Sequence, residues 1–494
     1  MAAAGIVLHL RNYASAGVLS AVVGLVSFPI LTRSLSVAEY GIVGLITSSL
    51  TLFIAIGKLG VQHSVIRFFA QVKNANIDFS VGQLNSTVSL VFFCFACITT
   101  GLWLVTGLYI LPNVLQYENI SSLFMLASVI VFVRLLGSGA MNFLRAQQRS
   151  GDVAVSQSLA RFLNLCFVIA VLLLSTLDPV SVISCLLVAE VLGVSYAVYQ
   201  YWPDFQFKTN EVSGRLVKAL LVYGLPLMIL ESLSLVLRLS DRYLIESILG
   251  VSELGQYSAS YNFASYIDII ILASLMQAVK PAYMQMWEQD GKARTEAFLA
   301  KGFHLFLVLG IPFITMFSIT SPHLLSFLAG EKYAPGTIII PFVAFSFLLE
   351  GAVHFLAAGL YIFKNTKILM IWSLIATVIN LVLNVLLIPG FGIAGAAMVT
   401  VISYAVFMVG VSILGFRHVS FPVSLRTPVL MSLASAFVFA VLNPLSLGPD
   451  MASFLIKGFA GTSVLLLFMW LIDPTVRQWL GERTARFIRR EAKS

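Results

Sequence analysis

Apolar runs of about twenty residues recur along the chain from end to end, separated by short polar segments. An α-helix needs roughly 20 predominantly apolar residues to cross the hydrocarbon core of a bilayer. We therefore predict an all-α polytopic membrane protein of about fourteen transmembrane helices. The expected spans are 12–32, 40–57, 86–110, 120–144, 156–176, 180–201, 216–239, 256–279, 302–328, 337–361, 367–388, 393–415, 426–443 and 453–472.

The polar segments between the runs are short. The longest of them, roughly 58–85, begins with an amphipathic stretch and predicts a helix extension or an interfacial helix. Composition agrees with a lipid-facing surface: 59% of the residues are hydrophobic and 11% are charged, whereas soluble domains carry about 25% charged residues. No separate soluble domain is expected.

The net charge of +8 could suggest a nucleic-acid partner, but the placement of the cations favours membrane topology and no nucleic acid. With a cytoplasmic N-terminus, 23 of the 30 Lys and Arg fall in cytoplasmic segments. This bias is the positive-inside rule, and an even number of spans places both termini in the cytoplasm. We expect a multi-pass protein whose basic tail, 475–494, lies on the cytoplasmic side.

A short motif occurs twice. Residues 35–41 read LSVAEYG and residues 249–255 read LGVSELG, an offset of 214. Each copy follows the end of an odd-numbered span, which is typical of transporters built from two parallel repeats. The expected organisation is an N-terminal lobe (1–205), a C-terminal lobe (206–417), two further helices (418–474) and the basic tail (475–494).

Polar side chains form stripes within several spans. In the seventh span, Glu231, Ser234, Arg238 and Arg242 are spaced 3, 4 and 4 residues apart and therefore share one helical face. Asp241 lies beside them. The other candidates are Arg134, Asn142, Arg161, Asn164, Glu190, Asp268, Glu350, His354, Asn380 and Asn384. Charges within a bilayer are costly and normally face a bundle interior or a wet cavity.

These stripes predict a hydrophilic cavity between two lobes. Arginine suits a phosphate ligand because its planar fork donates bidentate hydrogen bonds at any pH. The arginines are therefore candidates for substrate binding, the asparagines and Ser234 for polar lining. The carboxylates and His354 are candidates for coupling to H⁺ or Na⁺.

Structural roles remain open for some of these residues. Arg161 could snorkel to the cytoplasmic surface, and Asp241 with Arg242 could form an interfacial ion pair. Glu190 could be a structural partner of Arg134 or Arg161. His354 lies one turn from Glu350 and could form one hydrogen-bonded unit with it.

Other chemistry is not expected. The chain has no nucleotide-binding P-loop and no long loop that could carry a catalytic site, so we predict a transporter and not an enzyme. The four cysteines lie inside apolar runs and are interpreted as small core residues, with no metal site and no cofactor.

Two segments carry a resemblance to a known family. FPILTRSLSVAEYGIVGL (28–45) and YGLPLMILESLSLVLRLSDRYLIESILGVSELGQYSASY (223–261) resemble the signatures that begin the two halves of bacterial polysaccharide flippases of the O-antigen type. That family belongs to the superfamily of multidrug exporters and lipid II flippases, the MOP superfamily. Arg33, Asp241 and Arg242 are the charged residues that we carry over from the matched segments.

The resemblance implies two six-helix lobes in a V around a cavity that opens alternately to each side. The implied substrate is an undecaprenyl-diphosphate-linked oligosaccharide, an O-antigen or other surface polysaccharide unit, moved across the bacterial inner membrane. Membrane lipids and the polysaccharide polymerase machinery are the other expected partners. We expect a monomer, because one chain contains both lobes.

Three alternatives stay open. A cation-coupled multidrug exporter would have an acidic, aromatic cavity, and the arginines argue against it. A lipid II flippase would also have fourteen spans. A membrane polysaccharide polymerase or ligase would need a sizeable external loop with catalytic Arg or His.

Overall fold

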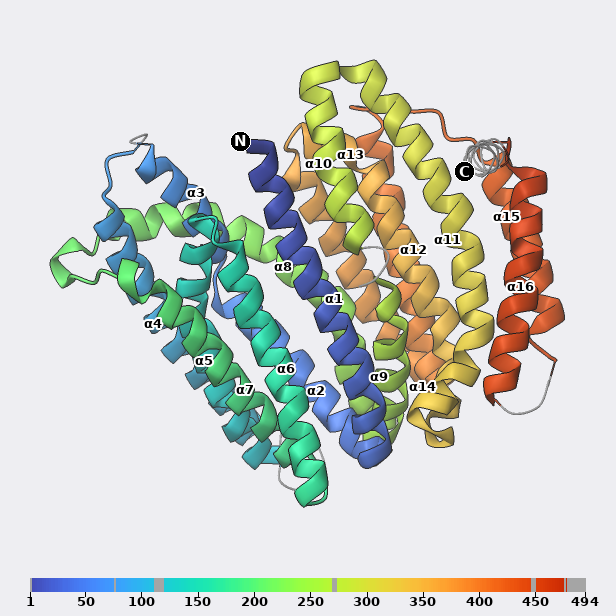
Figure 1. Ribbon diagram of the computed structural model, residues 1–494, viewed down its shortest axis with the longest axis horizontal. Helices are drawn as coiled ribbons and strands as arrows, with labels where there is room; N and C mark the ends of the chain where they lie inside the picture. Colours follow the sequence, from blue (N-terminus) through green and yellow to red (C-terminus); the bar gives the residue numbers. More distant parts are fainter. Residues whose placement is uncertain are drawn as a thin grey trace, which may run out of the picture. The chain divides into compact units, whose positions relative to one another are not determined.

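The computed structural model describes residues 2–74, 77–110, 120–268, 273–445, 450–474 and 477. All regular elements in these ranges are helical (Figure 1). Their bounds are α1 Ala2–Ser34, α2 Val37–Gly57, α3 Val61–Lys73, α4 Val81–Val105, η1 Thr106–Ile110, α5 Ile120–Ala146, α6 Ser150–Leu174, α7 Pro179–Tyr201, η3 Trp202–Asp204, η4 Thr209–Glu211, α8 Gly214–Leu249, α9 Val251–Ala264, α10 Ala273–Asp290, α11 Lys292–Ala329, η6 Glu331–Ile339, α12 Ile340–Leu356, α13 Ala358–Ile362, α14 Thr366–Gly415, α15 Arg426–Leu442 and α16 Asp450–Ile472.

The predicted membrane class is confirmed. Among the described residues, 11 helices are long and apolar enough to cross a membrane, and α15 is a shorter apolar helix. The expected segment after residue 58 contains the predicted amphipathic helix, α3. The basic tail lies outside the described residues, except for Arg477.

One span prediction needs correction. The predicted span 256–279 is not one helix, because α9 ends at Ala264 and α10 begins at Ala273. The predicted spans 367–388 and 393–415 agree with α14, which consists of two helices separated by a kink at Gly392, where φ is 59° and ψ is −147°. Glycine tolerates this left-handed backbone, so the chain changes direction there without a connecting loop.

The chain forms two compact units. Unit 1 comprises residues 1–259 and 373–396, and unit 2 comprises 260–372 and 397–494. The division differs from the lobes expected at 205/206, because α8 and the middle of α14 belong to unit 1. The predicted lobe boundaries stay a prediction.

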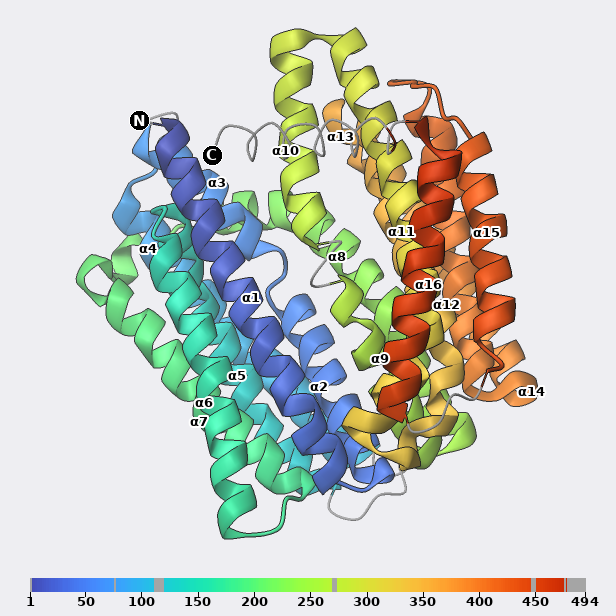
Figure 2. The same ribbon diagram turned by 45° about the vertical axis from the view of Figure 1, so that its right-hand side comes forward.

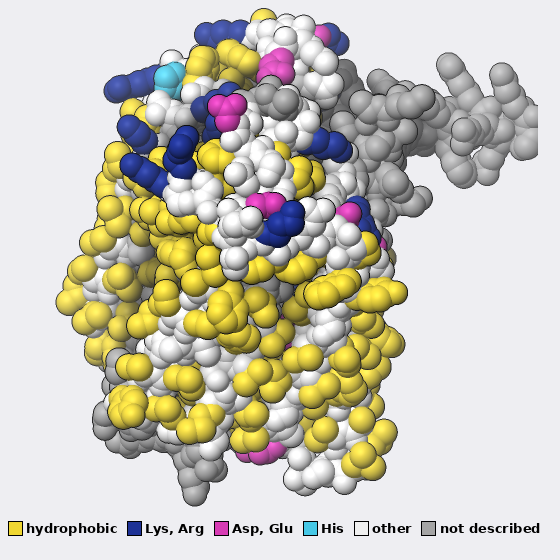
Figure 3. Space-filling view, turned by 90° about the vertical axis from the view of Figure 1, so that its left-hand side faces the viewer, with side chains coloured by type: hydrophobic (Ala, Val, Ile, Leu, Met, Phe, Trp, Pro, Cys, Tyr) yellow, Lys and Arg dark blue, Asp and Glu magenta, His cyan; other side chains and the backbone are white. Residues whose placement is uncertain are grey.

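Unit 1 is a bundle around α5. This helix packs against α4, α7, α2 and α3, and α7 packs against α6 (Figures 1 and 2). A buried apolar cluster joins α3, α4 and α5, where Phe69, Phe92 and Phe143 lie in its centre. Figure 3 shows one face on which Lys and Arg gather toward one end and hydrophobic side chains cover much of the remainder, as a membrane-spanning bundle requires.

The repeated motif has a structural counterpart within unit 1. In the first copy, Ser36 and Glu39 form a capping box that begins α2, with Ser36 N donating to Glu39 Oε2 over 2.8 Å. The copies then meet at their glycines. A Cβ on Gly41 would lie 2.7 Å from Val251 O, and a Cβ on Gly255 would lie 1.9 Å from Val37 O.

These two contacts are reciprocal. Residues 37 and 41 are the counterparts of 251 and 255 at the offset of 214. The glycine of each copy therefore contacts the valine of the other copy. Such a self-complementary arrangement is what a pseudo-two-fold axis produces. Only glycine permits the backbones to approach this closely.

Unit 2 is organised around α11, which packs against α10, α12, α15 and α16. The helices α15 and α16 lie side by side in both ribbon views (Figures 1 and 2). Polar contacts near both ends of α16 join it to α11: Lys457 Nζ lies 3.0 Å from His323 Nε2, and Asp473 Oδ2 lies 2.6 Å from His304 Nε2.

Candidate functional site

A polar cavity of about 440 Å³ lies within unit 1, between α2, α5, α6, α7 and α8. Its charged lining consists of Lys58, Arg134, Arg145, Arg161, Glu190 and Glu231. Its uncharged polar lining consists of Thr51, Ser138, Asn142, Ser156 and Gln157. We call this the cationic cavity, because four cationic side chains line it and only two carboxylates do.

Helix α5 supplies one wall. Arg134, Ser138, Asn142 and Arg145 recur at intervals of three or four residues, which places them on one helical face. Arg145 Nη1 donates to Asn142 Oδ1 over 3.2 Å, and the Ser138 hydroxyl bonds back to Arg134 O. Both bonds lie within α5 and link neighbouring side chains of this polar face to each other or to the backbone.

One ion pair crosses the cavity wall. Arg134 Nη2 donates to Glu190 Oε1 over 2.5 Å, joining α5 to α7. Both side chains are partly shielded from solvent. The interpretation of Glu190 as a partner of Arg134 therefore agrees with the geometry, and both residues also line the cavity.

The second carboxylate of the cavity, that of Glu231, is contacted by side chains of α3. Glu231 Oε2 on α8 accepts from Gln62 Nε2 over 3.0 Å and lies 3.2 Å from His63 Nε2. The turn before α3 is locked on α8, because a Cβ on Gly60, whose φ is +73°, would lie 1.9 Å from Gly224 O. The donors for Glu231 thus come from a rigidly placed helix.

Lys58 occupies the turn between α2 and α3. Burial lowers the pKa of its ammonium below the ordinary value; the carboxylate of Glu231 opposes this shift, and the guanidinium groups of Arg145 and Arg134 add to it. A lysine in this setting is held in a cationic environment, and an incoming anion would favour its charged form.

Three of the four cations have no ion pair. In the described part of the chain, no carboxylate oxygen lies within 4.0 Å of the side-chain nitrogens of Lys58, Arg145 or Arg161. Cations around a cavity that are not held in ion pairs attract an anion and can donate charge-assisted hydrogen bonds to it.

The structure brings together five of the residues predicted from the sequence: Arg134, Asn142, Arg161, Glu190 and Glu231. Sequence reasoning did not select Lys58, Arg145, Gln157 or His63 as site residues. Arg145 and Gln157 continue the stripes of Arg134 and Arg161 at helical spacing, and that signal could have included them. Lys58 and His63 lie outside the predicted spans, and the positive-inside pattern already accounts for the charge of Lys58.

The other predicted residues of unit 1 lie away from the lining of this cavity. Asp241 and Arg242 are buried within α8, where Arg242 Nη1 donates to Ser48 Oγ over 2.6 Å and Tyr257 donates to Asp241. They are therefore a buried interhelical network and not an interfacial pair. Arg33 is exposed near the end of α1, and Arg238 is half-buried on α8.

The predicted polar-lining residues also differ in their setting. Asn380 Oδ1 accepts from Ser240 Oγ and from Asn384 Nδ2, each over 3.0 Å, and both asparagines are fully buried between helices. Ser234 is exposed and bonds back to Leu230 O. Asn164 is half-buried on α6.

In unit 2, Asp268, Glu350 and His354 are half-buried. None of them lines the cationic cavity. Their role in ion coupling stays a prediction. The described residues contain no group of three or more His, Cys, Asp or Glu that could hold a metal ion.

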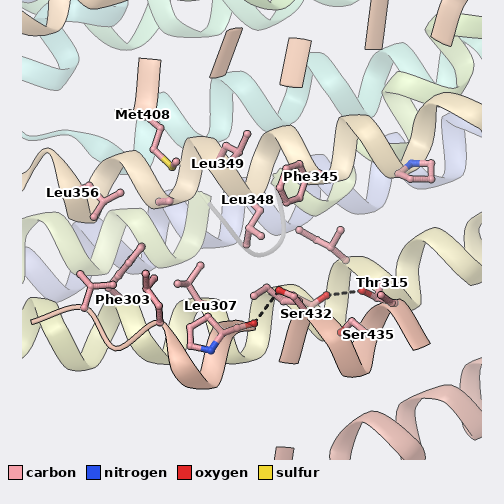
Figure 4. A pocket seen from close by; sticks show the side chains of 18 of the residues that line it. Phe303, Leu307, Thr315, Phe345, Leu348, Leu349, Leu356, Met408, Ser432 and Ser435 are labelled. Carbon is pink, nitrogen blue, oxygen red and sulfur yellow. Dashed lines mark hydrogen bonds between the residues drawn. The ribbon is translucent and has the colours of Figure 1, made fainter. Parts of the chain in front are cut away.

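Unit 2 contains a larger cavity of different character, about 880 Å³, between α11, α12, α14 and α15 (Figure 4). Phe303, Leu307, Phe345, Leu348 and Met408 are typical of its lining. The hydroxyls of Thr315 and Ser432 bond to carbonyls of their own helices, Ile311 O and Pro428 O. We call this the apolar cavity, since no charged residue lines it.

Comparison with known proteins shows which families the chain resembles. Residues 12–287 match the family described as polysaccharide biosynthesis protein, and residues 226–386 match the MatE family. The succinoglycan biosynthesis transport protein ExoT of Rhizobium meliloti is 26% identical over 332 residues, 65% of this chain and 62% of the relative. The uncharacterized membrane protein MJ1068 of Methanocaldococcus jannaschii is 28% identical over 239 residues, 46% of this chain and 45% of the relative. The chain thus covers less than two thirds of the length of both relatives.

The fold is shared with solved transporters. The inward closed conformation of the lipid II flippase MurJ superposes with a TM-score of 0.75 at 14% identity, covering 93% of this chain and 98% of that one. An inward-facing multidrug resistance MATE transporter of the MOP superfamily gives 0.65 at 13% identity, covering 82% and 94%. Since the family match spans more than half of its residues, the chain belongs to the polysaccharide biosynthesis protein family.

Proposed function

We propose that this protein is a flippase that carries an undecaprenyl-diphosphate-linked oligosaccharide from the cytoplasmic to the external leaflet of a bacterial inner membrane. The cationic cavity supports the proposal most strongly. Lys58, Arg145 and Arg161 supply positive charge outside any ion pair where a diphosphate group would bind. Family membership and the transport and flippase names of relatives agree with it.

In this mechanism, the cavity binds the head group and exposes it alternately to each side, while the lipid tail stays in the membrane. Each arginine donates several N–H groups to phosphate oxygens, and Lys58 adds a point charge. The pair formed by Arg134 and Glu190 keeps the fourth cation in place. No covalent chemistry is needed, because transport requires only differential binding of the two states.

The test uses cells that lack the gene and measures lipid-linked oligosaccharide on the cytoplasmic face. We expect native protein to clear the intermediate and Arg145→Gln/Arg161→Gln to leave it. Arg215→Gln is the matched control, since Arg215 is exposed in the same unit and does not line the cavity. If no intermediate builds up and the cells become drug-sensitive, the multidrug-exporter function replaces this proposal.

We also propose that transport is coupled to an ion gradient, with Glu231 as the first candidate and Asp268, Glu350 and His354 as the others. Glu231 supports this role because its carboxylate lines the cavity and contacts the titratable His63. Flipping in proteoliposomes should fall when a protonophore or a sodium ionophore dissipates the relevant gradient. Flipping that continues unchanged with both ionophores would exclude coupling.

A further inference from the structure

Unit 2 carries a second cluster of side chains that could bind a ligand, where α10, α13 and the end of α14 meet. It comprises Lys280, Trp287, Tyr361, Phe363 and His418, and we call it the aromatic strip. Neither the cationic cavity nor the apolar cavity includes any of these residues.

The contacts within the strip are direct. Lys280 Nζ lies 3.9 Å from the centre of the Tyr361 ring. Two turns further along α10, the Trp287 ring lies 5.5 Å from that of Phe363 at 72°, and the Phe363 ring lies 5.1 Å from the His418 imidazole. Lys280 and Trp287 are seven residues apart, so both face α13.

The strip lies outside the helices that are long and apolar enough to cross a membrane. Among the described residues, the candidate spans of this region end at Leu356 and Gly415, and α10 is not one of them. Phe363 is nevertheless 49% exposed. Lys280 makes no ion pair with a described carboxylate and rests on an aromatic ring instead.

Exposed aromatic rings beside an ammonium and an imidazole suit a carbohydrate ligand. Sugar C–H groups carry partial positive charge and stack on the negative faces of aromatic rings. An ammonium can donate hydrogen bonds to sugar hydroxyls, and an imidazole can donate to them or accept from them. By the positive-inside pattern, Lys280 and the neighbouring Lys364 and Arg417 belong to cytoplasmic segments, where an oligosaccharide would be loaded.

We propose that the aromatic strip is a docking site for the sugar residues of the oligosaccharide head group on the cytoplasmic side. The proposal rests on the flippase function and adds a glycan site apart from the cationic cavity. Trp287 and Phe363 present ring faces to the sugars, while Lys280 and His418 bond to their hydroxyls. An interfacial aromatic belt, which only anchors a helix in the bilayer, is the competing explanation.

The experiment compares two substrates in proteoliposomes of the full chain. One is the lipid-linked oligosaccharide isolated from cells that lack the gene; the other is undecaprenyl diphosphate carrying only the first sugar. For Trp287→Leu/Phe363→Leu we expect the half-saturating concentration to rise about tenfold for the full oligosaccharide, through the loss of two ring contacts. It should stay unchanged for the monosaccharide lipid.

Two matched variants complete the design. Trp202→Leu/Phe205→Leu removes a stacked pair at the end of α7, with rings 5.6 Å apart, and should leave both substrates unaffected. Trp287→Phe/Phe363→Tyr keeps two rings and should behave as the native protein, which separates docking from misfolding. Equal shifts for both substrates, no shift for either, or the same shift in the Trp202 variant would overturn the proposal. Native protein that flips neither lipid would instead overturn the flippase function itself.

Discussion

The cavities of the two units differ in chemistry although a repeated motif begins both halves of the chain. The cationic cavity of unit 1 is lined by six charged residues in about 440 Å³, whereas the apolar cavity of unit 2 is lined by none in about 880 Å³. In the first, hydroxyls and amides accompany the charges; in the second, Thr315 and Ser432 bond only to their own helices. The two copies of the motif meet at Gly41 and Gly255, but the two cavities have different side chains, so the repeated motif does not determine the chemistry of the cavities.

The largest effect is expected from placing a charge in the apolar cavity. Leu348 is 6% exposed and borders this cavity and a neighbouring apolar one of about 700 Å³. Leu348→Lys should destabilise the protein by at least about 3 kcal/mol, because a buried charge without a partner loses its solvation. Thermal unfolding and membrane yield measure this. Leu348→Met, which conserves volume, is the control, and a stable Leu348→Lys protein would show that the cavity is wet.

A smaller effect is expected from unpairing a cation in the cationic cavity. Glu190→Gln leaves Arg134 without its 2.5 Å carboxylate partner and adds one uncompensated positive charge. We expect the half-saturating substrate concentration to fall about tenfold and stability to fall by about 1 kcal/mol. Asp152→Asn is the control, since the Arg149–Asp152 pair has similar exposure outside the cavity. Equal changes in both variants would contradict a binding role for the charge.

The pH dependence of substrate affinity should distinguish the cationic cavity, which is lined by Lys58, from the apolar cavity, which no charged residue lines. Since burial lowers the pKa of Lys58, the cavity loses this charge at a lower pH than an exposed lysine would, and substrate affinity should weaken on the alkaline side. The sign for stability is opposite, because the penalty for burying the charged form falls as the pH rises above the lowered folded-state pKa and is gone above the ordinary lysine pKa.

Lys58→Arg tests this assignment, because arginine stays charged over the whole range. The alkaline loss of affinity, measured as half-saturating concentration against pH, should move to higher pH. An identical pH profile in the native protein and the variant would exclude Lys58 as the titrating group.

The smallest effect is expected from Ser432→Ala in the apolar cavity. Its hydroxyl bonds to Pro428 O one turn earlier in α15, so its loss leaves no buried partner unsatisfied. Transport should be unchanged and stability should stay within about 0.5 kcal/mol. A clear loss of transport would indicate that this hydroxyl contacts a polar ligand.

The helices and the polar face of α5 could be predicted from the sequence. Spacing alone placed Arg134 and Asn142 on one side of a helix, because periodicity records which residues share a face. Spacing does not record which helices meet. The residues of the α8 stripe therefore separate in the structure: Glu231 lines the cavity, whereas Arg242 is buried against Ser48.

The turn residues of the site could not be predicted for a different reason. Lys58 lies where a topology argument already explains a positive charge, so its position carried no further signal, and His63 lies in the same segment outside the predicted spans. Their role depends on the close contact of Gly60 with Gly224, which docks α3 on α8. The end of α9 at Ala264 could not be predicted either, since the apolar run of the sequence continues beyond it.

The most direct test of the central claim is the binding of undecaprenyl diphosphate, without any sugar, to the purified protein in nanodiscs. The account predicts that Lys58→Gln/Arg145→Gln/Arg161→Gln weakens this binding at least about 100-fold, because three charge-assisted contacts are lost, while Arg215→Gln binds as the native protein does. Native affinity in the triple variant would contradict the assignment of the diphosphate to the cationic cavity.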